Sequence, residues 1–167
     1  MTDPLPISAS VHVDAPPDAV WAAVSDPTRM PQWSPECRRV VVLGGGSGVG
    51  TRFLGVNRRG WVLWPTVSTV VRHEPGRAIA WRVRQSAATW TYELQPEETG
   101  TRLTARRDLA GFSAMTRFGA PLIGGAESHD RELAEGLATT LARIKATVES
   151  AVGEQRPVTR GSREASG

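Results

Sequence analysis

The longest regular pattern in the chain is an apolar repeat that begins near Ser113 and ends near Val152. Its members recur at steps of three or four residues, the spacing that places side chains on one face of an α-helix. They are Met115, Phe118, Leu122, Ala126, Leu133, Leu137, Leu141, Ile144 and Val148. A helix with a single apolar face needs a broad partner surface. We therefore expect the preceding part of the chain to supply that surface.

That preceding part alternates apolar and polar residues with a period of two, which is typical of half-buried strands. Seven strands are expected, at Ile7–Val13, Val40–Leu43, Thr51–Asn57, Trp61–His73, Arg77–Gln85, Thr89–Gln95 and Thr101–Leu109. The last five are joined by turns short enough for hairpins, which predicts an antiparallel sheet. Alternation places these apolar residues on the side facing the helix: Ile79, Trp81, Val83, Trp90, Tyr92, Leu94, Leu103, Ala105 and Leu109. Pro65 predicts a bulge or a sheet edge at its position.

Prolines and capping residues predict two short helices after the first strand. Asp18 follows two prolines and suits the first turn of a helix, and residues 28–33 can form a second short turn. At the other end, Gly153 is predicted to cap the long helix, and residues 153–167 are expected to form a disordered tail. The pattern as a whole predicts one α+β domain over residues 1–152, in which a curved antiparallel sheet wraps around the long helix.

The composition agrees with a single domain and excludes several protein classes. The chain has 167 residues, 40% of them hydrophobic, which is enough for one core. No window approaches the roughly 18 apolar residues of a membrane span, so a cytoplasmic protein is expected. The single cysteine, Cys37, fits a reducing compartment. The net charge of +3 comes almost entirely from arginine, as in GC-rich bacterial genomes, and leaves open whether it serves an anionic partner.

The motifs of common enzymes are missing from the sequence. The glycine run at residues 44–50 fits neither a dinucleotide-binding fingerprint nor a phosphate-binding loop, and we predict a hairpin loop there. The histidines have no partner at metal-ligand spacing, and neither HExxH, CxxC nor GxSxG occurs. We therefore expect no metal and no cofactor, and the sequence identifies no catalytic residue.

Four segments carry a resemblance to a known superfamily. They are residues 13–21 (VDAPPDAVW), 26–35 (DPTRMPQWSP), 50–60 (GTRFLGVNRRG) and 74–77 (EPGR). In order and spacing they resemble the helix-grip (SRPBCC) superfamily, which includes the birch pollen allergen, START-related lipid-transfer domains and small bacterial polyketide cyclase/dehydrase proteins. The resemblance implies a cavity between sheet and helix. It also implies that Trp33 closes one end of the cavity and that Phe53 and Asn57 line it.

The remaining candidate ligand-binding residues follow from their expected faces. Strand alternation favours Trp81, Trp90, Tyr92 and Arg107. Trp61 and Trp64 have opposite parity, so at most one of them faces inward unless a bulge intervenes, and Trp64 is included as a candidate. The helix contributes Phe118, Leu122, His129 and Leu133. Ordinary roles stay open: the aromatic residues as plain core, Asn57 as a turn residue and His129 as a surface residue. Arg107 either anchors the acidic or carbonyl end of a ligand or, near the strand's end, reaches solvent or pairs with a helix carboxylate.

Three classes of function remain open. The first is binding or carriage of a hydrophobic small molecule, such as a lipid, a polyketide or another aromatic compound. The second is a cyclase or aromatase-like enzyme that positions a polyketide and moves protons through Tyr92, His129 or Arg107. The third is an interaction protein with a basic surface. We expect no sequence-specific nucleic acid binding, and a monomer or a homodimer.

Overall fold

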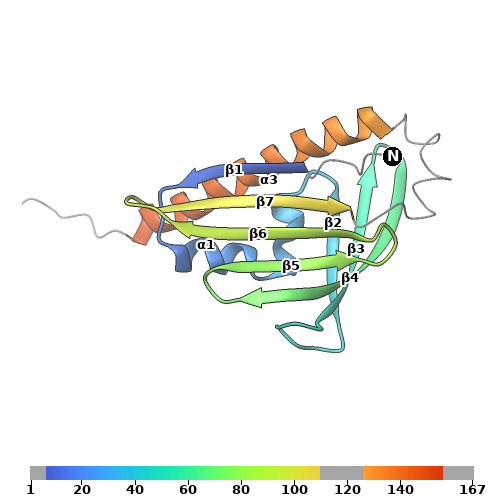
Figure 1. Cartoon of the computed structure of the whole chain (residues 1–167), viewed down its shortest axis with the longest axis horizontal. Coiled ribbons are helices and arrows are strands. Elements are labelled where there is room, and N and C mark those ends of the chain that lie inside the picture. Colours follow the sequence, from blue (N-terminus) through green and yellow to red (C-terminus); the bar gives the residue numbers. More distant parts are fainter. Residues whose placement is uncertain (1–6, 110–125, 156–167) are drawn as a thin grey trace, which may run out of the picture.

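The computed structural model describes residues 7–109 and 126–155, with the side chains of residues 126–130 outside the description. Seven strands form one sheet: β1 (Ile7–Val13), β2 (Cys37–Leu43), β3 (Arg52–Arg59), β4 (Val62–Glu74), β5 (Ala78–Val83), β6 (Ala88–Pro96) and β7 (Thr101–Leu109). Their order is β1-β7-β6-β5-β4-β3-β2, and every neighbouring pair is antiparallel. Figure 1 shows β3 and β4 turning away from the direction of β5, β6 and β7, so the sheet is strongly curved. This is the helix-grip arrangement that the sequence predicts.

Two short helices follow β1, as expected. Helix α1 (Pro17–Val24) has prolines at its start and buries Val20, Ala23 and Val24. The 3₁₀ helix η1 (Pro27–Gln32) begins after Asp26, whose carboxylate accepts a hydrogen bond of 2.9 Å from the backbone N–H of Thr28. This cap satisfies one of the donors that a helix start leaves without a partner. The chain then reaches β2 through a short loop.

The long helix α3 (Ala126–Gln155) packs along β1 behind the sheet (Figure 1). Its inward stripe is nearly inaccessible to solvent, with Leu137, Leu141, Ile144 and Val148 each at most 5% exposed. The predicted cap at Gly153 is wrong, because α3 continues through Gln155. A glycine tolerates helical backbone angles at a modest cost, so it does not by itself end a helix. The predicted helical residues 113–125 lie outside the described part of the chain.

Alternation assigned the faces of the central strands correctly. Trp81, Tyr92, Leu103 and Ala105 are buried, whereas the intervening arginines such as Arg82 are exposed. The predicted hairpin loop joins β2 to β3, and Gly44, Gly45, Gly46 and Gly50 there have positive φ angles.

Of the two alternatives predicted at Pro65, a bulge or a sheet edge, the structure shows the edge. The register shift lies between Val70 and Arg72, not at Pro65. Pro65 pairs with Val56 of β3, but the pairing of β4 with β5 begins only at Ser68. Pro65 therefore lies in the part of β4 that has a neighbouring strand on one side alone, where its missing N–H costs no ladder hydrogen bond.

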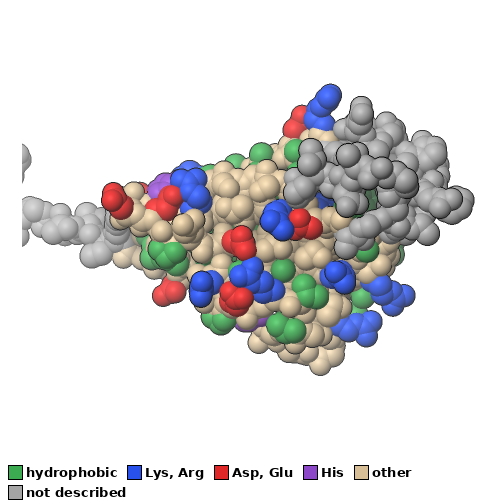
Figure 2. Space-filling model, in the orientation of Figure 1, with side chains coloured by type: hydrophobic (Ala, Val, Ile, Leu, Met, Phe, Trp, Pro, Cys, Tyr) green, Lys and Arg blue, Asp and Glu red, His purple; other side chains and the backbone are tan. Residues whose placement is uncertain are grey.

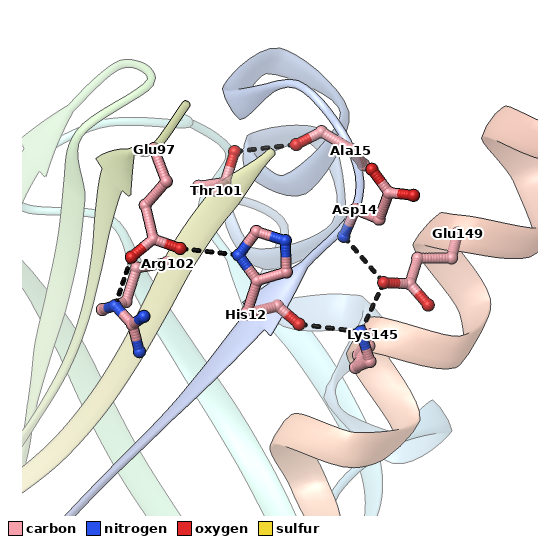
Figure 3. Close-up of polar contacts among 8 residues, drawn as sticks. All are labelled: His12, Asp14, Ala15, Glu97, Thr101, Arg102, Lys145 and Glu149. Atoms are coloured by element: carbon pink, nitrogen blue, oxygen red, sulfur yellow. Dashed lines mark hydrogen bonds and ion pairs between the residues drawn. The ribbon is translucent and has the colours of Figure 1, made fainter. Parts of the chain in front are cut away.

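A polar cluster fastens α3 to the end of β1 (Figure 3). Lys145, the single lysine of the chain, donates a hydrogen bond of 2.8 Å to the carbonyl of His12 and one of 2.5 Å to the carboxylate of Glu149. The same Glu149 oxygen accepts a 2.7 Å hydrogen bond from the backbone N–H of Asp14. The pKa of Glu149 is lowered, mainly by the hydrogen bond from Lys145 and then by that from Asp14. These contacts hold the C-terminal part of α3 against the sheet.

Candidate ligand-binding site

A cavity of about 270 Å³ lies between the curved sheet and α3. The strands from β2 to β7 form its wall, and the loop after η1 together with Leu133, Leu137 and Thr140 of α3 completes it. Apolar side chains supply most of the lining. The volume lies just below the range of roughly 300–1,000 Å³ typical of small-molecule pockets, so the cavity suits a compact ligand.

Three aromatic residues, from β3, β5 and β6, form a continuous part of the cavity wall. Trp81 stacks on Tyr92 with their ring centroids 5.5 Å apart and an interplanar angle of 21°. Phe53 meets Trp81 edge to face at 6.0 Å. All three are at most 4% exposed, so close packing fixes their orientation. Such a wall offers flat apolar surface to a ring system.

The Tyr92 hydroxyl is the most informative polar group in the cavity. No hydrogen bond joins it to any residue that the structure describes, and no described side-chain oxygen or nitrogen is both fully buried and without a partner. The hydroxyl is therefore open to the cavity that Tyr92 lines. Burial raises the pKa of Tyr92 well above its ordinary value, so the group keeps its proton and acts as a hydrogen-bond donor.

Further polar groups lie on the strands that surround this hydroxyl. The Asn57 amide donates a hydrogen bond of 3.1 Å to the Thr66 hydroxyl, and both residues line the cavity. The side-chain amide oxygen of Gln85, just after β5, accepts a 2.9 Å hydrogen bond from the backbone N–H of Val67. The guanidinium of Arg107, which is half-buried, lies 5.8 Å from the ring centroid of Trp90. The cavity thus combines an apolar body with a few fixed polar positions.

Cys37 also lines the cavity, but its thiol is not suited to nucleophilic chemistry. Burial raises its pKa to about 11, with smaller opposing effects from the Arg39 backbone and the Arg38 charge. A thiol with that pKa is almost entirely protonated at neutral pH, whereas the thiolate is the nucleophile. Within residues 7–109 and 126–155, no group of three histidine, cysteine or acidic side chains could hold a metal ion. Over the same residues, no helix is both long and apolar enough to cross a membrane.

The structure brings together eight of the residues proposed from the sequence. Those that line the cavity are Phe53, Asn57, Trp64, Trp81, Trp90, Tyr92, Arg107 and Leu133. Trp33 is not among the lining residues, because its ring is buried in the core with Arg29 placed 4.8 Å from the ring centroid. Its neighbours Ser34 and Pro35 reach the cavity instead. Phe118, Leu122 and the side chain of His129 lie outside the described part of the chain.

The sequence reasoning missed several lining residues on the strands and in the loops, Met30 of η1, and four on α3, which are Glu132, Gly136, Leu137 and Thr140. Met30, Pro35 and Ser86 have no periodic pattern around them that could indicate a direction. Thr140 could have been found, because it lies three residues after Leu137 on the inward stripe. Its hydroxyl donates a hydrogen bond of 2.8 Å to the carbonyl of Gly136, so a polar residue is accommodated on a buried helix face.

Comparison with known proteins agrees with this architecture. The chain is 30% identical to the polyketide cyclase-like protein Cgl2372 from Corynebacterium glutamicum, with 93% of this chain and 98% of that one covered and a TM-score of 0.66. Two aromatase/cyclases share the fold at lower identity. StfQ, a di-domain protein of the steffimycin biosynthetic pathway, has 17% identity and a TM-score of 0.72, and ZhuI from a Streptomyces species has 19% and 0.69. The alignments cover 89% of this chain in both cases, but 51% of StfQ and 95% of ZhuI.

No match was found among proteins with curated functions. The family model described as "polyketide cyclase / dehydrase and lipid transport" matches residues 5–149, which is most of the chain. The chain therefore belongs to the polyketide cyclase/dehydrase and lipid-transport family.

Proposed function

We propose that this protein binds a compact, largely aromatic small molecule that carries a carbonyl or hydroxyl oxygen. The observation that carries the proposal is the Tyr92 hydroxyl, a protonated donor open to a cavity whose wall is the stacked Trp81–Tyr92 pair. Buried tyrosine hydroxyls usually find a partner inside the protein, so one directed at a cavity is suited to a ligand acceptor. Ring systems fit the flat wall, and a two-chain phospholipid is too large for about 270 Å³.

Catalysis of a cyclase or aromatase type is the second candidate. It is favoured by the placement of Tyr92 and Arg107 in the same cavity, on strands that are hydrogen-bonded neighbours. Because Tyr92 keeps its proton, it would orient and polarise a ligand carbonyl rather than remove a proton. Arg107 would stabilise negative charge that develops on an enolate oxygen. In this reading the protein holds a flexible polyketide in the geometry required for ring closure.

A basic interaction surface is less well supported by the charges of the outer sheet face. Figure 2 shows basic and acidic side chains interspersed over the middle of that face, with basic ones alone toward its lower right. Arg72 forms ion pairs with Glu74 and Glu93, and Arg106 forms one with Asp108. These pairs neutralise much of the charge that a polyanion would need.

A pair of tryptophan variants tests the proposed binding. Quenching of tryptophan fluorescence and the rise in melting temperature would be measured with a panel of flavonoids, polyketide-like aromatics, fatty acids and phosphatidylcholine. We expect the compact aromatic compounds to bind. Trp90→Ala should weaken their binding because Trp90 lines the cavity, whereas Trp61→Ala should not, because Trp61 is 96% exposed and lies outside it.

Two results would contradict the proposal. One is that no compact aromatic compound stabilises the protein. The other is that both tryptophan variants affect binding equally, which would place the ligand on the surface. Native mass spectrometry of protein purified from its own host would then show whether another molecule accompanies it.

A further inference from the structure

The tip of the β3–β4 hairpin exposes three consecutive apolar residues. Trp61 is 96% exposed, Val62 61% and Leu63 62%. They follow Gly60, which has a φ of +57° and makes the tight turn. A single exposed apolar residue is ordinary, but three adjacent ones that include an almost fully exposed tryptophan indicate an interaction site.

This tip extends beyond both neighbouring strands. The β3–β4 ladder continues to the pair formed by Arg59 and Val62. On one side, the pairing of β2 with β3 ends at Cys37 and Asn57, and on the other, the pairing of β5 with β4 begins at Ser68. Residues 58–63 therefore form a two-stranded projection without a flanking strand in the described sheet, at the end of the sheet where β3 and β4 turn away in Figure 1.

Arginines accompany the apolar tip. Arg58 is exposed, and its backbone N–H donates a hydrogen bond of 2.8 Å to the carbonyl of Glu36, which brings the start of β2 beside the tip. Arg38 and Arg39, the second and third residues of β2, are also exposed. Arg59 forms an ion pair with Glu132 of α3 and so ties the projection to the helix. The tip thus combines an apolar end with adjacent positive charge.

These features match the surface of an anionic phospholipid bilayer. Tryptophan favours the boundary between headgroups and acyl chains, where its ring is apolar and its N–H remains hydrated. Arginines beside it are attracted to anionic headgroups, which supply phosphate oxygens as acceptors. A protein partner would need a pocket shaped for the tip, whereas a bilayer accepts a protruding apolar group of any shape.

We propose that the β3–β4 tip attaches this protein reversibly to anionic membranes. The same two strands carry Asn57 and Trp64, which line the cavity, so attachment would bring the cavity next to the bilayer. A hydrophobic ligand could then pass between membrane and cavity without crossing water. Attachment itself does not depend on the ligand, so its test is independent of the proposed ligand binding.

The test is co-sedimentation of the full chain with vesicles of phosphatidylcholine alone and of phosphatidylcholine mixed with phosphatidylglycerol. We expect binding to the anionic vesicles that weakens as salt increases. Trp61→Ser should reduce the partition coefficient about tenfold or more. The matched control is Val49→Ser, which changes a 67% exposed apolar residue in the loop between β2 and β3 and should leave binding within about twofold.

A charge variant tests the contribution of the arginines beside the tip to membrane binding. Arg58→Gln should weaken binding to anionic vesicles about fivefold, whereas Arg82→Gln, at an exposed position on β5, should not. None of these variants should change the melting temperature, because each replaces an exposed side chain.

Absence of binding to anionic vesicles would overturn the proposal, as would equal losses for Trp61→Ser and Val49→Ser. If the protein instead forms concentration-dependent dimers that Trp61→Ser dissociates, and vesicles do not bind, then the tip is a contact between two copies of the chain and the membrane proposal is wrong.

Discussion

Replacing Tyr92 by phenylalanine should separate the stability of the fold from recognition of the ligand. The hydroxyl makes no hydrogen bond to any residue that the structure describes, so its removal costs the folded state little. We expect the free energy of unfolding to change by less than about 0.5 kcal/mol. A ligand whose oxygen accepts a hydrogen bond from this hydroxyl should lose about 0.5–1.5 kcal/mol of binding free energy, a two- to tenfold weaker affinity.

The assay compares two aromatic ligands that differ only in one carbonyl or hydroxyl group. Isothermal titration calorimetry with parent and Tyr92→Phe protein should show a loss confined to the oxygen-bearing ligand. Because burial raises the pKa of Tyr92, the hydroxyl stays protonated, and this difference should be constant from neutral to mildly alkaline pH.

Thr101→Val provides a matched control that also removes one hydroxyl. The Thr101 hydroxyl is fully buried and donates a hydrogen bond of 2.8 Å to the carbonyl of Ala15, away from the cavity. This variant should therefore destabilise the protein by about 1–3 kcal/mol and leave the affinity unchanged. If Tyr92→Phe were the less stable of the two, or weakened both ligands equally, the hydroxyl would have a structural role and the reasoning would be refuted.

Three further predictions concern the fold. Leu141→Ala should lower the free energy of unfolding by about 2–5 kcal/mol in urea titrations, because Leu141 is 1% exposed on the inward face of α3. Gly100→Ala should destabilise far more than Gly45→Ala, since both glycines have positive φ but a Cβ at Gly100 would lie 2.2 Å from the carbonyl oxygen of Val13, whereas one at Gly45 meets nothing within 4 Å. Glu149→Gln should lower the melting temperature at pH 7, and this loss should shrink as the pH is lowered: the pKa of Glu149 is lowered in the folded state, so its contribution is fully present above the unfolded pKa near 4.3 and disappears as the pH falls through the folded value.

The sheet could be predicted because its information is local. The last three strands, between Arg77 and Leu109, carry clear alternation, and each turn between Thr51 and Leu109 carries its own glycine, proline or polar signal. The register of β4 could not be predicted in the same way. Val70 and Val71 are adjacent and both apolar, so alternation gives no indication that Val71 becomes 47% exposed at the register shift. A bulge there is decided by pairing with β5, which is a tertiary effect.

The two tryptophans of the β3–β4 hairpin illustrate the limit for the site. Opposite parity shows that Trp61 and Trp64 cannot both face inward, and the structure places Trp64 at the cavity and Trp61 in solvent. The sequence does not reveal that the hairpin extends past its neighbours, because that depends on where β2 and β5 begin and end their pairing. The exposure of Trp61 can therefore be predicted only once the extent of β2 and β5 relative to the β3–β4 hairpin is known.

Alternation also cannot distinguish a core aromatic residue from a cavity wall. Phe53, Trp81 and Tyr92 belong to the hydrophobic core and line the cavity at the same time, so the two readings of the sequence were not exclusive. Whether such rings fill the space or enclose it depends on the separation of sheet and helix, which periodicity does not contain. The hydroxyl of Tyr92 distinguishes the cases, because a solid core would have to satisfy or exclude it. A tyrosine at an inward position that no protein group satisfies is thus better evidence for a ligand than the number of tryptophans around it.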